Sequence, residues 1–175
     1  VIVTRSLSKA FGLANLRIGY AIASPELLKK VTPIQLFPIS NFIEDIAVDV
    51  FTDRDHLAVA VTTLKEWRQE LLEKLSSIPG ITVYPSEGNF LLVDTHNTGI
   101  SASRIKEALS QRKVEVADVT ERINDGRGYL RITINNPLEN EVVARMLNNV
   151  VAYANSASSS SVIFERDSSK IRPII

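Results

Sequence analysis

The sequence predicts an α/β chain, with strands and long helices followed by a second group of strands and helices. Three observations support this class. Residues 1–4 and 18–23 are short apolar runs of the kind found in strands. Residues 54–77 carry apolar side chains at helical spacing. Residues 129–134 alternate apolar and polar side chains, which indicates a strand with one buried face.

The charge composition is balanced, with 20 Lys and Arg against 20 Asp and Glu in 175 residues. This balance argues against a nucleic-acid tail or a polybasic membrane surface. Cysteine is absent and the two histidines are isolated, so we expect no disulfide and no metal site. No apolar run has the length of a membrane span, and we expect no signal peptide before the first strand. We therefore expect a cytoplasmic protein without nucleic-acid or membrane partners, and, because the chain starts without Met in a strand, a partial sequence.

The most informative stretch is residues 6–20, Ser-Leu-Ser-Lys-Ala-Phe-Gly-Leu-Ala-Asn-Leu-Arg-Ile-Gly-Tyr. It places Lys9 at the exit of a strand that we expect to be buried, and Arg17 just before the next strand. The hydroxyls of Ser6 and Ser8 alternate toward one side, where they can donate to phosphate oxygens. A lysine captures an aldehyde as its free amine, which burial and a neighbouring cation favour. The stretch therefore suits an anionic aldehyde; the alternative is a surface loop with solvated cations and turn-capping serines.

Helices are predicted to follow. Ser24 is a helix N-cap before Pro25, and the helix over 27–31 is cut short by prolines. Residues 32–40 are expected to be irregular. Apolar spacing then predicts a helix over 41–51.

A longer helix is predicted over 54–77, capped by Asp53. Trp67 lies on its apolar stripe, so we interpret it as a packing residue and not as one that stacks on a cofactor. His56, in the first turn, is expected to be exposed.

The following segment predicts strands over 81–84 and 89–94, a loop at 96–99, and a helix over 102–112 capped by Ser101. A short strand is expected over 114–116.

Residues 118–128 are polar and contain Asn-Asp-Gly, a turn signal. In the strand over 129–134, Arg131 is expected on the face opposite the apolar residues. A strand arginine needs an anion or an exposed face. After an Asn-Asn-Pro cap, a helix is predicted to about residue 154, followed by a serine-rich tail.

Residues 6–20 resemble the lysine segment of fold-type-I aminotransferases, most closely that of histidinol-phosphate aminotransferases. The runs Pro-Ser-Glu-Gly-Asn-Phe-Leu-Leu-Val over 85–93 and Leu-Arg-Ile-Thr over 130–133 resemble the same family. The resemblance extends to about residue 155 and implies the C-terminal half of such an enzyme. It implies the end of the large-domain sheet over 1–50 and an interdomain helix over 51–78, followed by a small α+β domain over 79–157 and a tail over 158–175.

The same resemblance implies pyridoxal 5'-phosphate as cofactor, with Lys9 as the catalytic lysine that binds it covalently. Ser6, Ser8 and Arg17 would surround the cofactor phosphate, and Arg131 would bind the anionic end of the substrate. The implied reaction is transamination between a small amino donor and a 2-oxo acid, namely histidinol phosphate and 2-oxoglutarate in histidine biosynthesis. Such enzymes are homodimers.

The sequence also departs from this family. Asn15 stands where glycine is usual, and Ala117 and Asp118 stand where a further arginine is usual. The family's partner for the pyridine nitrogen and its ring-stacking aromatic lie upstream of the matched residues. Aromatic or other amino-acid aminotransferases and threonine-phosphate decarboxylases therefore stay open. A catalytically silent small-domain fragment is the alternative of another class, and we expect the 175-residue chain alone to be inactive.

Overall fold

The computed structural model describes residues 1–30 and 39–164, with side chains described as far as residue 156. The chain divides into two compact units, Val1–Thr63 and Leu64–Ile175. Most of the segment predicted to be irregular, the end of the helix predicted over 27–31, and the end of the tail lie outside the described residues. Among the helices that are described, none combines the length and the apolar character needed to cross a membrane.

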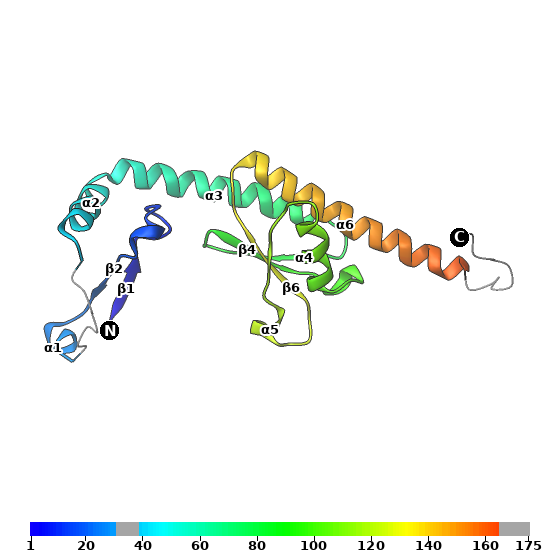
Figure 1. Ribbon diagram of the computed structural model, residues 1–175, viewed down its shortest axis with the longest axis horizontal. Helices are drawn as coiled ribbons and strands as arrows, with labels where there is room; N and C mark the ends of the chain where they lie inside the picture. Colours follow the sequence, from blue (N-terminus) through cyan, green and yellow to red (C-terminus); the bar gives the residue numbers. More distant parts are fainter. Residues whose placement is uncertain (31–38, 165–175) are drawn as a thin grey trace, which may run out of the picture. The chain divides into compact units, whose positions relative to one another are not determined.

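The first unit begins with an antiparallel hairpin of β1 (Val3–Ser6) and β2 (Gly19–Ile22), shown in Figure 1. Both strands were predicted, but their predicted burial is wrong, because every residue of either strand is exposed. The physical reason is that the two strands pair only with each other among the described residues. A two-stranded hairpin buries neither face unless another element packs on it.

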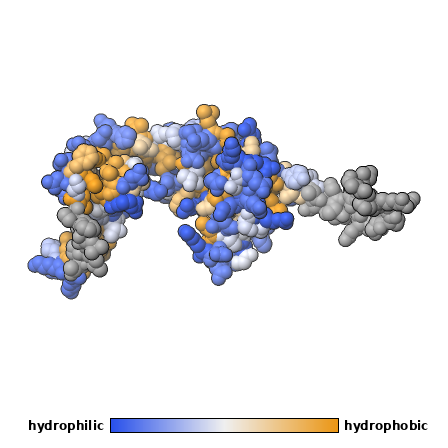
Figure 2. Space-filling model, in the orientation of Figure 1, coloured by the Kyte–Doolittle hydropathy of each residue, from blue (hydrophilic) through white to orange (hydrophobic). Residues whose placement is uncertain are grey.

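Two helices follow the hairpin. In α1 (Pro25–Leu28) the Oγ of Ser24 accepts the N–H of Leu27 at 3.4 Å, so the predicted N-cap is confirmed. Helix α2 (Asn41–Thr52) closely matches its predicted range. Its apolar residues are largely uncovered, with Phe42 71% exposed. Figure 2 shows hydrophobic residues gathered on the surface around this helix, so the first unit has little core of its own.

Helix α3 (Arg54–Ser76) carries the chain from the first unit into the second. Its start is capped as predicted, since Oδ1 of Asp53 accepts the N–H of His56 at 2.9 Å. Near its end, Leu71 and Leu75 are fully buried. Trp67 packs against the same core, which confirms the packing interpretation.

The second unit contains a four-stranded antiparallel sheet in the order β3-β4-β6-β5. Its two central strands, β4 and β6, are labelled in Figure 1. Its strands are β3 (Thr82–Tyr84), β4 (Phe90–Asp94), β5 (Ala117–Asp118) and β6 (Tyr129–Thr133). One face is buried against α4 (Ala102–Ser110), α6 (Pro137–Phe164) and the end of α3. The core residues of this face come from the two central strands and are Leu91, Val93, Leu130 and Ile132.

Three predictions for the second unit need correction. The strand expected over 114–116 is wrong, and Ala117–Asp118 pair with β6 instead. Lys113 adopts a left-handed conformation with φ 61°, and the N–H of Val114 donates to the Leu109 carbonyl at 3.0 Å, so the chain folds back on α4 there. The predicted loop over 118–128 contains a short helix, α5 (Thr120–Ile123). Helix α6 continues to Phe164, beyond the predicted end.

Candidate functional site

The predicted lysine stretch forms a tight loop between β1 and β2. Leu7 is 1% exposed and organises the loop: its N–H donates to the Ile18 carbonyl at 3.2 Å, and its carbonyl accepts the N–H of Leu13 at 3.1 Å. Gly12, with φ 70°, donates its N–H to the Lys9 carbonyl at 3.1 Å. The backbone around Lys9 is therefore fixed by the loop's own hydrogen bonds.

The predicted cofactor residues lie on one short segment of the chain, with Ser6 at the end of β1 and Ser8, Lys9 and Arg17 in the loop that follows. The N–H of Ser8 donates to Oγ of Ser6 at 3.1 Å, so the two serines form one turn at the strand exit. Lys9 follows directly and is exposed, which corrects the expectation that it leaves a buried strand. Its exposure follows from the uncovered hairpin that carries it.

Arg17 is also exposed and lies at the end of η1 (Ala14–Leu16), in a left-handed conformation with φ 56°. One of its guanidinium nitrogens donates to the Ala14 carbonyl at 2.9 Å. A guanidinium carries five N–H donors, so this bond leaves others for an anion. An amine, two hydroxyls and a guanidinium on one loop are a donor set that fits a small phosphorylated aldehyde.

An aromatic cluster connects the loop to α2. The ring of Phe51 lies edge-on to that of Phe11 at 5.3 Å and to that of Tyr20 at 5.4 Å between centroids. The same three rings line an open pocket of about 640 Å³ whose other walls come from α2 and the start of α3. Sequence reasoning missed this cluster, although Phe11 and Tyr20 lie within residues 6–20.

The predicted substrate residue, Arg131, lies on β6 in the second unit. The expected alternation is confirmed: Leu130 and Ile132 are buried at 0% and 1% exposure, and Arg131 is exposed on the opposite face. Its guanidinium carbon is 5.8 Å from the centre of the Phe90 ring, at cation–π distance. Within the described part of the chain, the ion pairs that form do not include Arg131.

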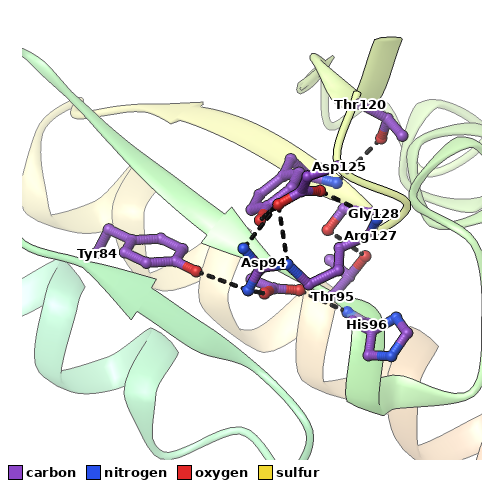
Figure 3. A network of polar contacts seen from close by, with 9 residues as sticks. Tyr84, Asp94, Thr95, His96, Thr120, Asp125, Arg127 and Gly128 are labelled. Carbon is purple, nitrogen blue, oxygen red and sulfur yellow. Dashed lines mark hydrogen bonds and ion pairs between the residues drawn. The ribbon is translucent and has the colours of Figure 1, made fainter. Parts of the chain in front are cut away.

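A second arginine on this side of the sheet is held by several groups (Figure 3). The guanidinium of Arg127 pairs with Asp94 at 3.0 Å and with Asp125 at 2.7 Å. It also donates to the hydroxyl of Tyr84 at 3.2 Å and lies 5.2 Å from the centre of the Tyr129 ring. Arg127 thus joins the loop before β6 to strands β3 and β4.

The Tyr129 hydroxyl completes this network by donating to Asp125 at 2.7 Å. This bond, followed by those from Arg127, lowers the pKa of Asp125 to about 2. Burial, followed by the bond to Asp125, raises the pKa of Tyr129 above its ordinary value. Sequence reasoning missed the network, because the Asn-Asp-Gly signal within residues 118–128 predicts a turn and does not predict contacts with the strands. Over the described residues, no group of three or more His, Cys, Asp or Glu is arranged to hold a metal ion.

Comparison with known proteins agrees with the resemblance of residues 6–20 to aminotransferases. Residues 1–149 match the profile of the family described as "Aminotransferase class I and II". The chain is 38% identical over 134 residues to the histidinol-phosphate aminotransferase of Methanopyrus kandleri, covering 76% of this chain and 34% of that protein. It is 29% identical over 152 residues to that of Methanosphaera stadtmanae, covering 86% of this chain and 41% of that protein. The chain therefore spans well under half of these relatives.

Solved structures show the same fold. A decarboxylase from Sulfurospirillum multivorans matches with a TM-score of 0.76 and 26% identity, covering 86% of this chain and 44% of that one. The histidinol-phosphate aminotransferase from Sinorhizobium meliloti, solved in complex with pyridoxal-5'-phosphate, matches with a TM-score of 0.69 and 26% identity. The match covers 88% of this chain and 42% of that one. The histidinol-phosphate aminotransferase from Clostridium acetobutylicum matches in fold, with a TM-score of 0.79 and 22% identity. The match covers 87% of this chain and 46% of that one.

These likenesses confirm the predicted fold class, part of a fold-type-I pyridoxal-phosphate transferase. The profile match covers both units of the structure, from the hairpin with Lys9 to the sheet with Arg131. The chain belongs to the class I and II aminotransferase family.

Proposed function

We propose that the protein is a pyridoxal-phosphate-dependent aminotransferase that transfers the amino group of histidinol phosphate to 2-oxoglutarate. The observation that carries the proposal is the loop joining Ser6, Ser8, Lys9 and Arg17, in a chain 38% identical over 134 residues to a histidinol-phosphate aminotransferase. The enzyme would act in histidine biosynthesis as a homodimer.

The proposed division of labour follows the order of the chain. We assign residues 1–50 to the cofactor-binding domain, 51–78 to the interdomain helix, 79–157 to the small domain and 158–175 to a tail. The boundary between the two compact units, inside α3, supports a connecting role for that helix.

On the first unit, the chain's own groups would bind the cofactor and move protons. When bound, pyridoxal phosphate supplies an electron-withdrawing ring that stabilises negative charge at the α-carbon of the substrate. The hydroxyls of Ser6 and Ser8 and the guanidinium of Arg17 would bind its phosphate and so fix the position of the ring. Lys9 would bind the cofactor covalently and, as the free amine, would move the proton from the substrate α-carbon to the C4′ atom of the cofactor, so that the amino group stays on the cofactor.

On the second unit, Arg131 would bind the anionic end of the substrate. Its planar guanidinium can hold a carboxylate or a phosphate through two parallel hydrogen bonds. Its exposure, its stacking on Phe90, and its absence from the ion pairs of the described residues leave it available for such an anion. Fixing this end orients the reacting C–H bond, which is a large part of catalysis in positioned reactions.

The test is an assay of the whole protein for glutamate formed from histidinol phosphate and 2-oxoglutarate. Lys9→Ala should lower kcat by about a thousandfold or more, because no other group supplies the amine. Lys29→Ala is the matched control, since this lysine is exposed at the end of α1, and it should leave kcat unchanged. Arg131→Met should raise KM for histidinol phosphate more than it lowers kcat. Full activity in Lys9→Ala would refute the proposal.

A second candidate of the same fold is a decarboxylase acting on a phosphorylated amino acid such as threonine phosphate. It is favoured by the likeness to the Sulfurospirillum multivorans decarboxylase and by Ala117 and Asp118, which replace the arginine usual in histidinol-phosphate enzymes. Release of CO₂ from threonine phosphate without glutamate formation would support it. If neither CO₂ nor glutamate is formed, the remaining alternative is the catalytically silent fragment.

A further inference from the structure

We propose that Arg127 is a positioning residue that keeps Arg131 free for an anionic ligand by occupying the carboxylate of Asp94. This inference rests on the proposed role of Arg131 in substrate binding. It follows from the pairing register of the sheet and from the different partners of the two arginines.

The register places an acid within reach of Arg131. Leu92 on β4 lies directly opposite Arg131, so the next β4 residues on the same face are Phe90 and Asp94. Diagonal neighbours of this kind have Cβ atoms about 7 Å apart, which a long side chain spans. Arg131 therefore has two alternative β4 neighbours, one aromatic and one acidic.

The structure shows Arg131 on the aromatic neighbour. Its guanidinium lies 5.8 Å from the centre of the Phe90 ring, and no ion pair joins it to Asp94 among the described residues. Both oxygens of Asp94 are already engaged: Oδ1 accepts the N–H of His96 at 2.8 Å, and Oδ2 pairs with Arg127 at 3.0 Å. The Asp94 side chain is only 9% exposed, so solvent offers it little alternative.

Arg127 is itself fixed in this position by the network of Figure 3. Two guanidinium nitrogens of Arg127 donate to Oδ2 of Asp125, at 3.0 and 2.7 Å. The backbone N–H of Arg127 donates to Oδ1 of Asp125 at 3.1 Å. The Tyr84 hydroxyl and the Tyr129 ring contact the guanidinium as well. One cation thus pairs with two carboxylates on this side of the sheet.

Removal of the Arg127 guanidinium should draw Arg131 toward Asp94. A poorly solvated carboxylate that loses its cation takes the nearest replacement, because an unpaired buried charge is costly. At Asp94 that replacement is Arg131, one diagonal step away. Arg131 would then leave Phe90, and an incoming anion would have to compete with Asp94 for it.

The experiment needs no cofactor and no activity. In the full chain, the Nε–Hε resonance of Arg131, assigned by its loss in Arg131→Met, is followed by NMR as inorganic phosphate is added. Arg127→Met should weaken phosphate binding at this resonance about fivefold, the competition expected from one ordinary ion pair. The double variant Arg127→Met with Asp94→Asn should restore the wild-type affinity, because the competing carboxylate is gone.

Two further variants separate positioning from a structural effect. Arg127→Lys keeps a cation beside Asp94 and should bind phosphate nearly as the wild type does. Arg122→Met removes an exposed arginine from the neighbouring α5 and should change nothing. In the whole enzyme, Arg127→Met should raise KM for histidinol phosphate with little change in kcat.

Unchanged phosphate affinity in Arg127→Met would overturn the inference. So would failure of Asp94→Asn to restore it, or a loss in Arg127→Lys as large as that in Arg127→Met. The titration is independent of transamination, so absence of glutamate formation in the wild type would refute the proposed function while leaving the titration result to stand alone.

Discussion

The hydroxyl of Tyr129 donates to Oδ2 of Asp125 at 2.7 Å, joining the first residue of β6 to the turn that precedes it. Tyr129 is 2% exposed, so a buried ring supports an exposed carboxylate. The bond is the largest cause of the low pKa of Asp125, about 2 against an ordinary 3.8. The conformation of this turn is therefore coupled to the charge of one carboxyl group.

Tyr129→Phe tests this coupling because it removes the hydroxyl and keeps the ring. The pKa of Asp125 should rise toward 3.8. A carboxyl whose pKa is depressed in the folded state stabilises the fold above its unfolded pKa, and that stability is lost as pH falls through the folded pKa. The loss in free energy of unfolding, relative to the wild type, should therefore be largest above about pH 4. This difference should shrink as the pH falls from 4 to 2. Urea unfolding across this range measures it, and a deficit independent of pH would contradict the coupling.

The core of the second unit can be tested with two leucines of the same helix. Leu147 is 0% exposed on α6, whereas Leu138 is 82% exposed near its start. Leu147→Ala should lower the free energy of unfolding by about 2 to 5 kcal/mol, because it leaves a cavity beneath the sheet. Leu138→Ala should change it by less than about 0.5 kcal/mol. Equal losses in chemical denaturation would show that α6 packs on the sheet differently.

The turn after α3 depends on a glycine with no room for a side chain. Gly80 has φ 81°, and a Cβ there would lie 2.6 Å from the backbone oxygen of Asn97. Gly126 has a similar φ of 85° and nothing within 4 Å of its Cβ position. Gly126→Ala should lower the free energy of unfolding by about 1 kcal/mol from backbone strain alone, and Gly80→Ala by clearly more. A smaller loss at Gly80 than at Gly126, measured by urea unfolding, would contradict this packing.

Features set by local patterns could be predicted from the sequence. Alternation placed Leu130 and Ile132 in the core and Arg131 outside it, and the caps at Ser24 and Asp53 follow from side chains close to their partners in sequence. Failures came where distant segments decide the outcome. The apolar composition of β1 and β2 predicts burial, but burial also requires a covering element.

In the candidate site, too, residues that are close in sequence could be predicted, and residues that only the fold brings together could not. The lysine loop is contiguous in sequence, so its donor set was visible in residues 6–20. The network around Arg127 joins Tyr84, Asp94 and Asp125, which are brought together only by the strand register. The strand expected over 114–116 failed because Lys113 adopts a left-handed conformation that is uncommon for a residue other than glycine.

Covalent capture of the cofactor is the decisive test of Lys9 as its attachment site. The whole protein is incubated with pyridoxal 5'-phosphate, reduced with borohydride and digested, and the modified peptide is located by mass spectrometry. We predict a reduced pyridoxyl group on Nζ of Lys9, and its loss in Lys9→Ala but not in Lys29→Ala. Label confined to other lysines, or no label at all, would contradict the assignment of Lys9.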